Sequence, residues 1–467
     1  TVCSDPLMTI DILPTIADLI GGELPDHDID GKNVWPLIVG EPGATSPQEA
    51  YFFFYRRGDM EGLRSGRWKL HFPHEYRTLS GGKGGTGGMP FPYDQAQTEL
   101  ELYDLTTDRN ETTNLAAERP DVVKRLKKLA DAKRQELGDQ LQGIEGTVVR
   151  PHGRLDSESG PDRNRNVSAH VPRGILAEIE RHREIVRFAQ EDSRVSYDNN
   201  QVRLDYVAIA RIHLIALLFV GLFAEPAAAQ TQPNRPNIVW IVVEDASAHV
   251  GCYGETTINT PHIDALAHDG IRFTNAFVTC PVCSPSRSAM VTGMYQTTLG
   301  AHNHRSQRVG GKGGAAQRDG ESFQLPVTSV PELFREAGYY VTNTGLNKNG
   351  KTDYNFVADG LYDKGDWSQR KRKPSQPFFA QIQLHGGKAR KAKVAEPVDP
   401  ADVHLPPYYP DTPVIRRDWT TYLNSWIKTD DEVGQIMDWL RQQGVLDDTV
   451  VFFWTDHGIS HLRGKQF

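Results

Sequence analysis

A short segment around Cys283 combines three features that can act together on an anionic group. Pro285 suits the first turn of a helix, because its missing N–H costs no hydrogen bond there, so Cys283 is expected directly before a helix. The amino terminus of a helix exposes backbone N–H groups and carries partial positive charge. Arg287, one turn further on, adds a permanent cation. The segment therefore predicts a sulfur side chain, a helix end and an arginine that face one anion.

Spacing alone leaves three interpretations of the cysteines open. Cys280 and Cys283 form a CxxC pair, which is typical of thioredoxin-like redox sites and of zinc sites. A zinc site needs further ligands, and the sequence contains no second CxxC pair. The simplest alternative is a buried cysteine in a turn that only packs against its neighbours. With Cys3 and Cys252 the chain has four cysteines, too few for a disulfide framework in 467 residues.

Acidic residues follow two apolar runs that read as buried strands. Glu244 and Asp245 end the first run, and Asp456 and His457 end the last one. The carboxyl ends of parallel strands meet at one edge of a sheet, where ligands bind. One acidic residue at a strand end is more often a solvated carboxylate or a helix cap. Two acidic pairs beside the cysteine segment favour a site of oxygen ligands for a hard cation.

The segment Cys283-Ser284-Pro285-Ser286-Arg287, followed by Thr292-Gly293, resembles the Cys-x-Pro-Ser-Arg-x4-Thr-Gly signature of the type I sulfatases. In that family a formylglycine-generating maturation enzyme oxidises the cysteine to formylglycine, an aldehyde that is hydrated in the resting enzyme. The resemblance implies that Cys283 is the precursor of the catalytic nucleophile. It implies hydrolysis of a sulfate ester, or of a sulfamate, on a sulfated small molecule or a sulfated glycan.

The same resemblance implies a calcium ion at the two acidic pairs, with the converted Cys283 as a further ligand. Sulfatases usually carry Asp-Asp and Asp-Asn at these positions. Asp245 and Asp456 match this pattern directly, whereas Glu244 has a longer side chain and His457 offers a nitrogen donor. We therefore expect calcium on Asp245 and Asp456, with Glu244 and His457 as the two ligands that depart from the family.

Several cations are implied to act on the sulfate group. Arg287 belongs to the signature, and Lys465 matches a family lysine that holds the sulfate. Lys351 falls where the family often has Gly-Lys-Trp-His, although the histidine of that phrase is missing here. A further family histidine follows a Pro-Phe-Phe strand. His385 and Lys388 both occupy this region, and the spacing favours Lys388.

The order of elements predicts four parts of the chain. In residues 231–467, buried apolar runs alternate with amphipathic segments, which predicts an α/β fold with a mainly parallel sheet flanked by helices. Residues 1–150 predict a smaller α+β subdomain, and residues 151–205 a poorly ordered linker. Residues 206–230 combine a basic flank, a short apolar run and small residues. They predict a signal peptide, and hence a periplasmic or secreted catalytic part, rather than a stable membrane span.

Residues 231–467 resemble the amino-terminal catalytic part of a sulfatase, which implies an alkaline-phosphatase-like fold. Residues 1–150 resemble the carboxy-terminal part of arylsulfatases, through the phrases at 9–15, 64–69 and 102–105. The two parts stand in the reverse of the family's order. We therefore expect an incomplete enzyme with weak or no turnover, formed from the tail of one sulfatase and the head of another. A circular permutant is the rival interpretation.

Composition and charge narrow the remaining alternatives. The hydrophobic share of 38% and the charged share of 24% are typical of a globular protein. A net charge of −8 gives no indication of nucleic-acid binding. Two alternatives to an active sulfatase stay open. One is a phosphoesterase of the same superfamily, and the other is a truncated or chimeric sulfatase fragment that binds anions without turnover.

Overall fold

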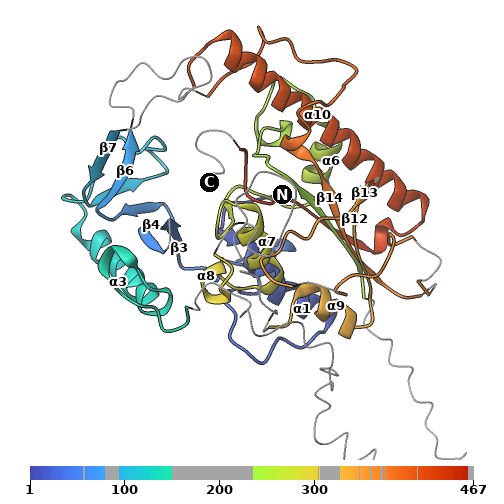
Figure 1. Ribbon diagram of the computed structural model, residues 1–467, viewed down its shortest axis with the longest axis horizontal. Helices are drawn as coiled ribbons and strands as arrows, with labels where there is room; N and C mark the ends of the chain where they lie inside the picture. The colour runs from blue at the N-terminus through green and yellow to red at the C-terminus, as the bar shows by residue number, and fades with distance from the viewer. Residues whose placement is uncertain are drawn as a thin grey trace, which may run out of the picture. The chain divides into compact units, whose positions relative to one another are not determined.

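We describe the fold from a computed structural model of the chain (Figure 1). The described residues within 1–155 and 235–467 form one compact unit. The predicted linker and the signal-peptide-like segment, residues 151–205 and 206–230, lie outside the described residues. The structure describes residues 1–55, 58–78, 94–149, 235–302, 304, 325, 327–346, 348–357, 360–368, 372–373, 375–406 and 409–460.

A five-stranded sheet in the order β13-β12-β14-β9-β15 lies at the centre of the catalytic part. The strands β12, β14, β9 and β15 are parallel, and β13 is antiparallel to β12. All seven residues of β9 are buried, as expected for a parallel strand covered on both faces. The predicted mainly parallel sheet is therefore confirmed. The strands are Lys348–Asn349 (β13), Tyr340–Gly345 (β12), Phe378–Leu384 (β14), Asn237–Val243 (β9) and Thr449–Thr455 (β15).

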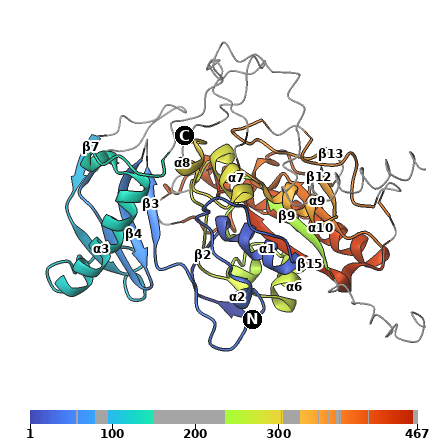
Figure 2. The same ribbon diagram turned by 90° about the horizontal axis from the view of Figure 1, so that it is seen from below.

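Helices cover both faces of this sheet, because alternate strand residues point to opposite sides. Trp240 and its neighbours on one face pack with α1, α7 and α9. Ile241 and its neighbours on the other face pack with α6 and α10. Figures 1 and 2 show the same grouping of helices around the sheet. The helices are Ile12–Ile20 (α1), Pro261–Asp269 (α6), Cys283–Thr292 (α7), Gln296–Leu299 (α8), Val330–Glu336 (α9) and Pro413–Gln442 (α10).

Residues 46–149 contain a second sheet with its own core. Four antiparallel strands follow the order β3-β4-β5-β8, and β6 pairs with β7 in a separate hairpin. The helix α3 packs its buried face, including Leu126, on the four-stranded sheet. The elements are Tyr51–Tyr55 (β3), Asp59–Ser65 (β4), Trp68–His71 (β5), His74–Thr78 (β6), Asp94–Thr98 (β7), Glu101–Asp104 (β8) and Pro120–Leu137 (α3).

The first forty residues have their core contacts with the catalytic sheet, although the sequence analysis includes them in the α+β subdomain. The strand β1 (Val2–Cys3) pairs in parallel with β10 (Arg272–Phe273), and β2 (Leu7–Met8) pairs with β11 (Ala276–Phe277). The helix α1 shares one apolar cluster with the central sheet, α7 and α9. Segments nearly three hundred residues apart in the chain therefore build one core.

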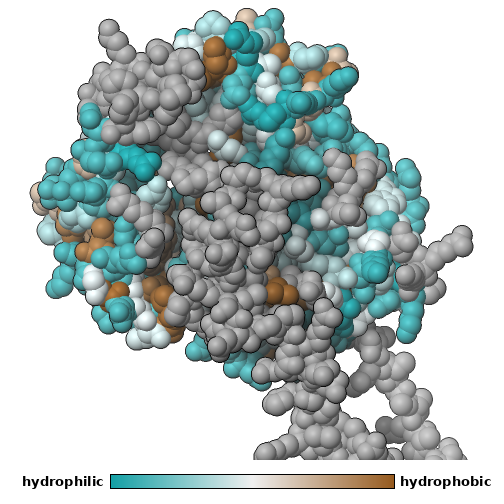
Figure 3. Space-filling view, in the orientation of Figure 1, coloured by the Kyte–Doolittle hydropathy of each residue, from teal (hydrophilic) through white to brown (hydrophobic). Residues whose placement is uncertain are grey.

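The described surface is mainly hydrophilic. On the face seen in Figure 3, hydrophobic residues occur as small separate groups among hydrophilic ones. Exposed side chains such as Val414 and Tyr76 are of this scattered kind, which is normal for a globular protein. Among the described helices, none combines the length and the apolar character that crossing a membrane requires.

Candidate active site

Two neighbouring strands deliver the acidic pairs to one edge of the sheet. Glu244 and Asp245 follow β9, and Asp456 and His457 follow β15. The two strands run parallel and in register up to their last residues, so the residues after them meet. The backbone N–H of Asp245 donates to Oδ1 of Asp456 at 3.2 Å. Asp245 has a left-handed backbone, with φ of 49°, a conformation that aspartate tolerates better than most residues do.

Four buried side chains converge at this edge: Asp245, Cys283, Asp456 and His457. One ligand atom from each lies within 4.8 Å of all the others. Nε2 of His457 lies 3.1 Å from Oδ1 of Asp245 and 3.2 Å from Oδ1 of Asp456. Two carboxylates and an imidazole are suitable ligands for a divalent cation, and the carboxylate oxygens are the donors that calcium prefers.

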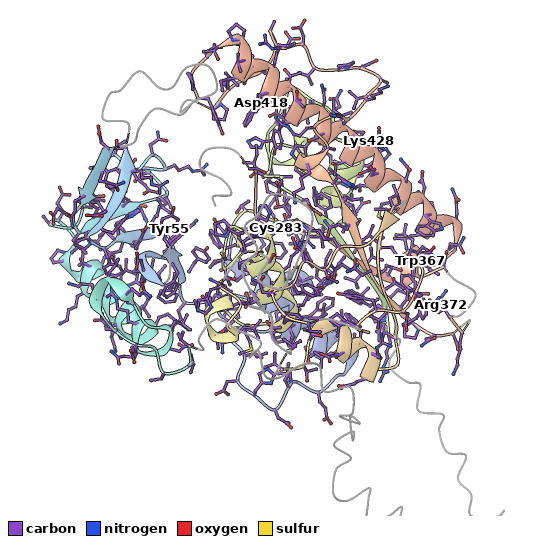
Figure 4. All side chains as sticks on the ribbon, viewed as in Figure 1. Tyr55, Cys283, Trp367, Arg372, Asp418 and Lys428 are labelled. Atoms are coloured by element: carbon purple, nitrogen blue, oxygen red, sulfur yellow. The ribbon has the colours of Figure 1, made fainter. Side chains whose placement is uncertain are left out.

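Cys283 is the first residue of the helix α7, one position further into the helix than the sequence predicts, and Figure 4 labels its side chain. Its Sγ lies 3.2 Å from Nε2 of His457 and 3.7 Å from Nζ of Lys388. Burial raises the pKa of the Cys283 thiol, but the hydrogen bond with His457 and the charge of Lys351 outweigh it, so that the pKa falls to about 7. Cys280, by contrast, has a pKa raised to about 12 by burial. Both cysteines are free thiols, so the CxxC pair is not a disulfide in this structure.

Glu244 lies among lysines rather than in the four-residue group. Its Oε2 lies 3.0 Å from Nζ of Lys351 and also pairs with Nζ of Lys388. Burial raises the pKa of Glu244, but the charges of Arg287, Lys351 and Lys388 outweigh it and hold the pKa below the ordinary value. Burial and the charge of Arg287 lower the pKa of Lys351. For Lys388 burial also lowers the pKa, but Glu244 reverses this effect and the pKa is raised.

Arg287 is fully buried and holds Asp456. Its Nε and Nη2 donate to Oδ2 of Asp456 at 3.3 and 3.1 Å. Burial lowers the pKa of the guanidinium, but Asp456 and Glu244 raise it above its ordinary value, so the charge stays. Nη1 of Arg287 is buried and has no hydrogen-bond partner among the described residues. A buried donor of this kind is costly to leave unsatisfied, and an anion bound beside it would accept its hydrogen.

Sequence reasoning missed three groups that orient the acidic pairs. Ser460 Oγ donates to Oδ2 of Asp245. Ser286 Oγ, in the signature itself, donates to the backbone carbonyl of Asp456 at 2.5 Å. The backbone carbonyl of Gly458 accepts from Nδ1 of His457 at 3.0 Å. None of the three carried a signal in the sequence, because only three-dimensional distance brings them to the acidic pairs.

The strand β14 delivers Lys388 through a turn that only glycine permits. A Cβ at Gly387 would collide with the backbone oxygen of Asp245, and a Cβ at Gly386 would collide with that of Glu244. Gly387 also donates its N–H to the carbonyl of Glu244 at 2.8 Å. The turn after β14 therefore lies directly against the strand end that carries the acidic pair.

The remaining candidate residues have different positions. His385 is exposed at the end of β14, whereas Lys388 reaches the four-residue group, where its Nζ lies 3.3 Å from Oδ1 of Asp245. Lys465 lies outside the described residues. Asp353, where the family has a histidine, is buried with a left-handed backbone, and its Oδ2 lies 3.4 Å from Nζ of Lys351.

Comparisons with known proteins agree with this geometry. Residues 236–467 match the family model described as Sulfatase, and residues 46–154 match the model for the C-terminal region of aryl-sulfatase. An ulvan-active sulfatase of Formosa agariphila is 31% identical over 294 residues, which cover 53% of this chain and 48% of the relative. The N-sulphoglucosamine sulphohydrolase of Homo sapiens is 27% identical over 274 residues, which cover 50% of this chain and 52% of the relative.

The chain spans about half the length of the curated relatives it matches. Among solved structures, the phosphonate monoester hydrolase of Agrobacterium radiobacter is similar with a TM-score of 0.35 and 17% sequence identity, covering 48% of this chain and 63% of that one. The two family models together match more than two thirds of the chain, and the signature at Cys283 lies inside the first of them. The chain therefore belongs to the sulfatase family.

Proposed function

We propose that this chain hydrolyses sulfate esters or sulfamates, with Cys283, converted to formylglycine, as the nucleophilic residue. The observation that carries the proposal is the position of Cys283. Cys283 is the first residue of the helix α7, at the carboxyl edge of the sheet. Its Sγ lies 3.2 Å from Nε2 of His457 and 3.7 Å from Nζ of Lys388. A nucleophile at a helix amino terminus, beside fixed cations, is well placed to attack an anionic sulfur centre.

Formylglycine explains why a cysteine stands at this position. A thiol that accepted a sulfuryl group would have no easy route to release it. In the hydrated aldehyde, one hydroxyl attacks sulfur as the alcohol leaves, and loss of the proton from the second hydroxyl re-forms the aldehyde and expels sulfate. Cys283 is buried at the start of the helix α7. In this proposal the same residue is the modification site and, after conversion, the group that attacks sulfur.

Fixed charges support turnover at this position. Lys351 and Lys388 share Glu244 as their counter-ion, and both are proposed to approach the sulfate oxygens. Arg287 contributes through its buried Nη1 and by holding Asp456. Lys465 is proposed to hold the sulfate, and His385 remains the alternative to Lys388. Charge that develops on the sulfate oxygens and the leaving group is stabilised most strongly where water is excluded.

A calcium ion is proposed on Asp245 and Asp456, with His457 and an oxygen of converted residue 283 as further ligands. A bound cation would polarise the sulfate group and stabilise its negative charge. The support from the structure is the donor set itself, in which each carboxylate keeps one oxygen toward the group while the other is held by Ser460 or Arg287. Glu244, the remaining expected ligand, is better placed as the partner of the lysines.

The proposed substrate is a sulfated glycan or a sulfated small molecule. The names N-sulphoglucosamine sulphohydrolase and N-acetylgalactosamine-6-O-sulfatase refer to sulfated amino sugars. These two relatives therefore favour a sulfated glycan as the substrate of this chain. A formylglycine-generating enzyme is the proposed maturation partner. A periplasmic or secreted location of the catalytic part is proposed from residues 206–230.

Turnover of paired substrates tests the proposal. The full chain is co-expressed with a formylglycine-generating enzyme, and hydrolysis of an aryl sulfate and of the matching aryl phosphate is measured. We expect the sulfate to be the faster substrate and Cys283→Ala to abolish its turnover, whereas the matched variant Cys280→Ala retains it. Phosphate hydrolysis that is faster and survives Cys283→Ala would assign the chain to the phosphoesterases instead.

A further inference from the structure

The four-residue group has a sulfur donor only while Cys283 is unconverted. Sγ of Cys283 lies 3.2 Å from Nε2 of His457, which lies 3.1 and 3.2 Å from the carboxylates of Asp245 and Asp456. Around a tetrahedral zinc ion, with bonds of about 2.0 Å to nitrogen or oxygen and about 2.3 Å to sulfur, neighbouring ligand atoms are roughly 3.3 to 3.6 Å apart. The observed separations around His457, 3.1 to 3.2 Å, are slightly shorter than this spacing, and all four ligand atoms lie within 4.8 Å of one another.

Each non-sulfur ligand is already oriented by a second partner. Nδ1 of His457 donates to the carbonyl of Gly458 at 3.0 Å, because a carbonyl only accepts, so Nε2 can offer a lone pair to an ion once its own proton has left. Oδ2 of Asp456 is held by Arg287 at 3.1 Å, and Oδ2 of Asp245 accepts from Ser460. Hydrogen bonds of this kind, from the far side of each ligand, are typical of built metal sites.

We propose that the unconverted chain binds a thiophilic divalent cation, represented by Zn²⁺, through Cys283, His457, Asp245 and Asp456. On binding, the S–H bond breaks, sulfur keeps the electron pair and donates it to the cation, and the proton leaves to the solvent. Nothing is oxidised or reduced. The inference rests on the proposed function only in taking Cys283 as the residue that is converted.

Conversion of Cys283 changes the preference of the group. Thiolate and imidazole donors suit Zn²⁺, whereas calcium takes six to eight oxygen ligands. Formylglycine replaces the soft sulfur with oxygen, so the same four positions then favour a hard cation.

Cobalt provides a direct probe of the sulfur ligand. The full chain is produced without a maturation enzyme, the thiol at Cys283 is verified by peptide mass, and Co²⁺ is titrated in. We expect a sulfur-to-cobalt charge-transfer band in the near ultraviolet that saturates at one ion per chain. The band disappears in Cys283→Ser and persists in the matched variant Cys280→Ser. A band that survives Cys283→Ser, or no band in a wild-type chain with a folded circular-dichroism spectrum, would overturn the proposal.

Two further measurements separate ligation from a merely structural effect. Ser460→Ala is expected to weaken Co²⁺ binding about 10-fold or more, with the band itself retained. One equivalent of Zn²⁺ is expected to slow alkylation of Cys283 by iodoacetamide and to leave that of Cys3 unchanged, because the free thiolate is the reactive form. Equal alkylation of Cys283 with and without Zn²⁺ would contradict the site. Turnover of an aryl sulfate by the converted chain is measured separately, so failure here leaves the proposed function standing.

Discussion

At the scale of single residues, the charge balance beside Cys283 depends on Glu244. One carboxylate oxygen of Glu244 neighbours the ammonium groups of both Lys351 and Lys388. Burial, and then the charge of Arg287, already lower the pKa of Lys351. Without that carboxylate the two lysines and Arg287 would repel one another in a largely buried space. Glu244 therefore keeps both lysines charged and close to the reacting position.

Glu244→Gln tests this role against that of a metal ligand. The amide keeps the shape but loses the charge, so we expect aryl sulfate turnover to fall roughly 10- to 100-fold, the scale of a lost hydrogen bond to a charged group. Calcium content, measured by elemental analysis, is expected to stay close to wild type. Asp245→Asn is the matched comparison and is expected to lose the metal. An equal loss of metal in both variants would make Glu244 a ligand.

At the scale of elements, three parallel strands and one helix place the site. The strands β9, β14 and β15 end together, and α7 begins at the same edge. The turn after β14 completes this arrangement, because Gly387 lets it lie against the backbone of Asp245. The mainly parallel α/β architecture thus brings the proposed ligands to the carboxyl edge of the sheet.

Gly387→Ala tests how tightly this edge is built. The added Cβ meets the backbone oxygen of Asp245, which is not the movable end of a side chain, so the strand end and its carboxylate have to shift. We expect weaker metal binding and at least about a 10-fold loss of turnover. A loss of this size is typical when the hydrogen-bond partners of metal ligands are disturbed. Gly22→Ala is the control, because its Cβ would have only ordinary contacts, the nearest at 3.5 Å. Similar behaviour of the two variants would contradict the close approach.

Sequence patterns predicted much of this arrangement and left specific pairings open. Apolar runs predicted the central strands, and Pro285 predicted a helix that begins directly after Cys283, within one residue of its observed start. Alignment by spacing preferred Lys388 to His385, and Lys388 is the one that reaches Asp245. The partner of Glu244 was not predictable, because a buried carboxylate can bind a metal ion or pair with a lysine. Only the three-dimensional distances distinguish these two roles. The hydrogen bond from Ser460 was missed for the same reason.

At the scale of the whole molecule, the first forty residues tie distant parts of the chain together. Asp11 orders this segment internally: its carboxylate accepts from the N–H groups of Met8 and Lys32 at 2.8 Å and from the side chain of Gln48. The same segment pairs its strands with those that precede the Cys283 helix. Periodicity within each segment predicts helices and strands but not this long-range docking.

The pKa of Asp11 makes the stability of this segment depend on pH. Burial raises it from 3.8 to about 6, although the hydrogen bonds from Met8 and Lys32 oppose the rise. The folded chain therefore keeps a proton that the unfolded chain releases. The corresponding stability is fully present below pH 3.8 and is lost as the pH rises through about 6. It amounts to about 3 kcal/mol at most.

Asp11→Asn removes this titration while keeping one carbonyl acceptor. We expect the wild-type free energy of unfolding to fall, relative to the variant, by about 2 to 3 kcal/mol between pH 3.8 and neutral pH. Denaturant unfolding of both proteins across that range measures the difference. Asp18→Asn, on the partly exposed side of α1, is a control that should follow the wild-type profile. Parallel profiles for wild type and Asp11→Asn would show that Asp11 does not set the dependence.

The central claim is that Cys283 is converted and that conversion gives sulfatase activity. The most direct measurement is the mass of the tryptic peptide that contains Cys283, recorded on preparations with and without the maturation enzyme and set against aryl sulfate turnover of the same samples. The account predicts that turnover rises in proportion to the fraction of the peptide that carries formylglycine, while Cys280 stays a thiol. Full turnover from a preparation whose Cys283 is entirely thiol would contradict it.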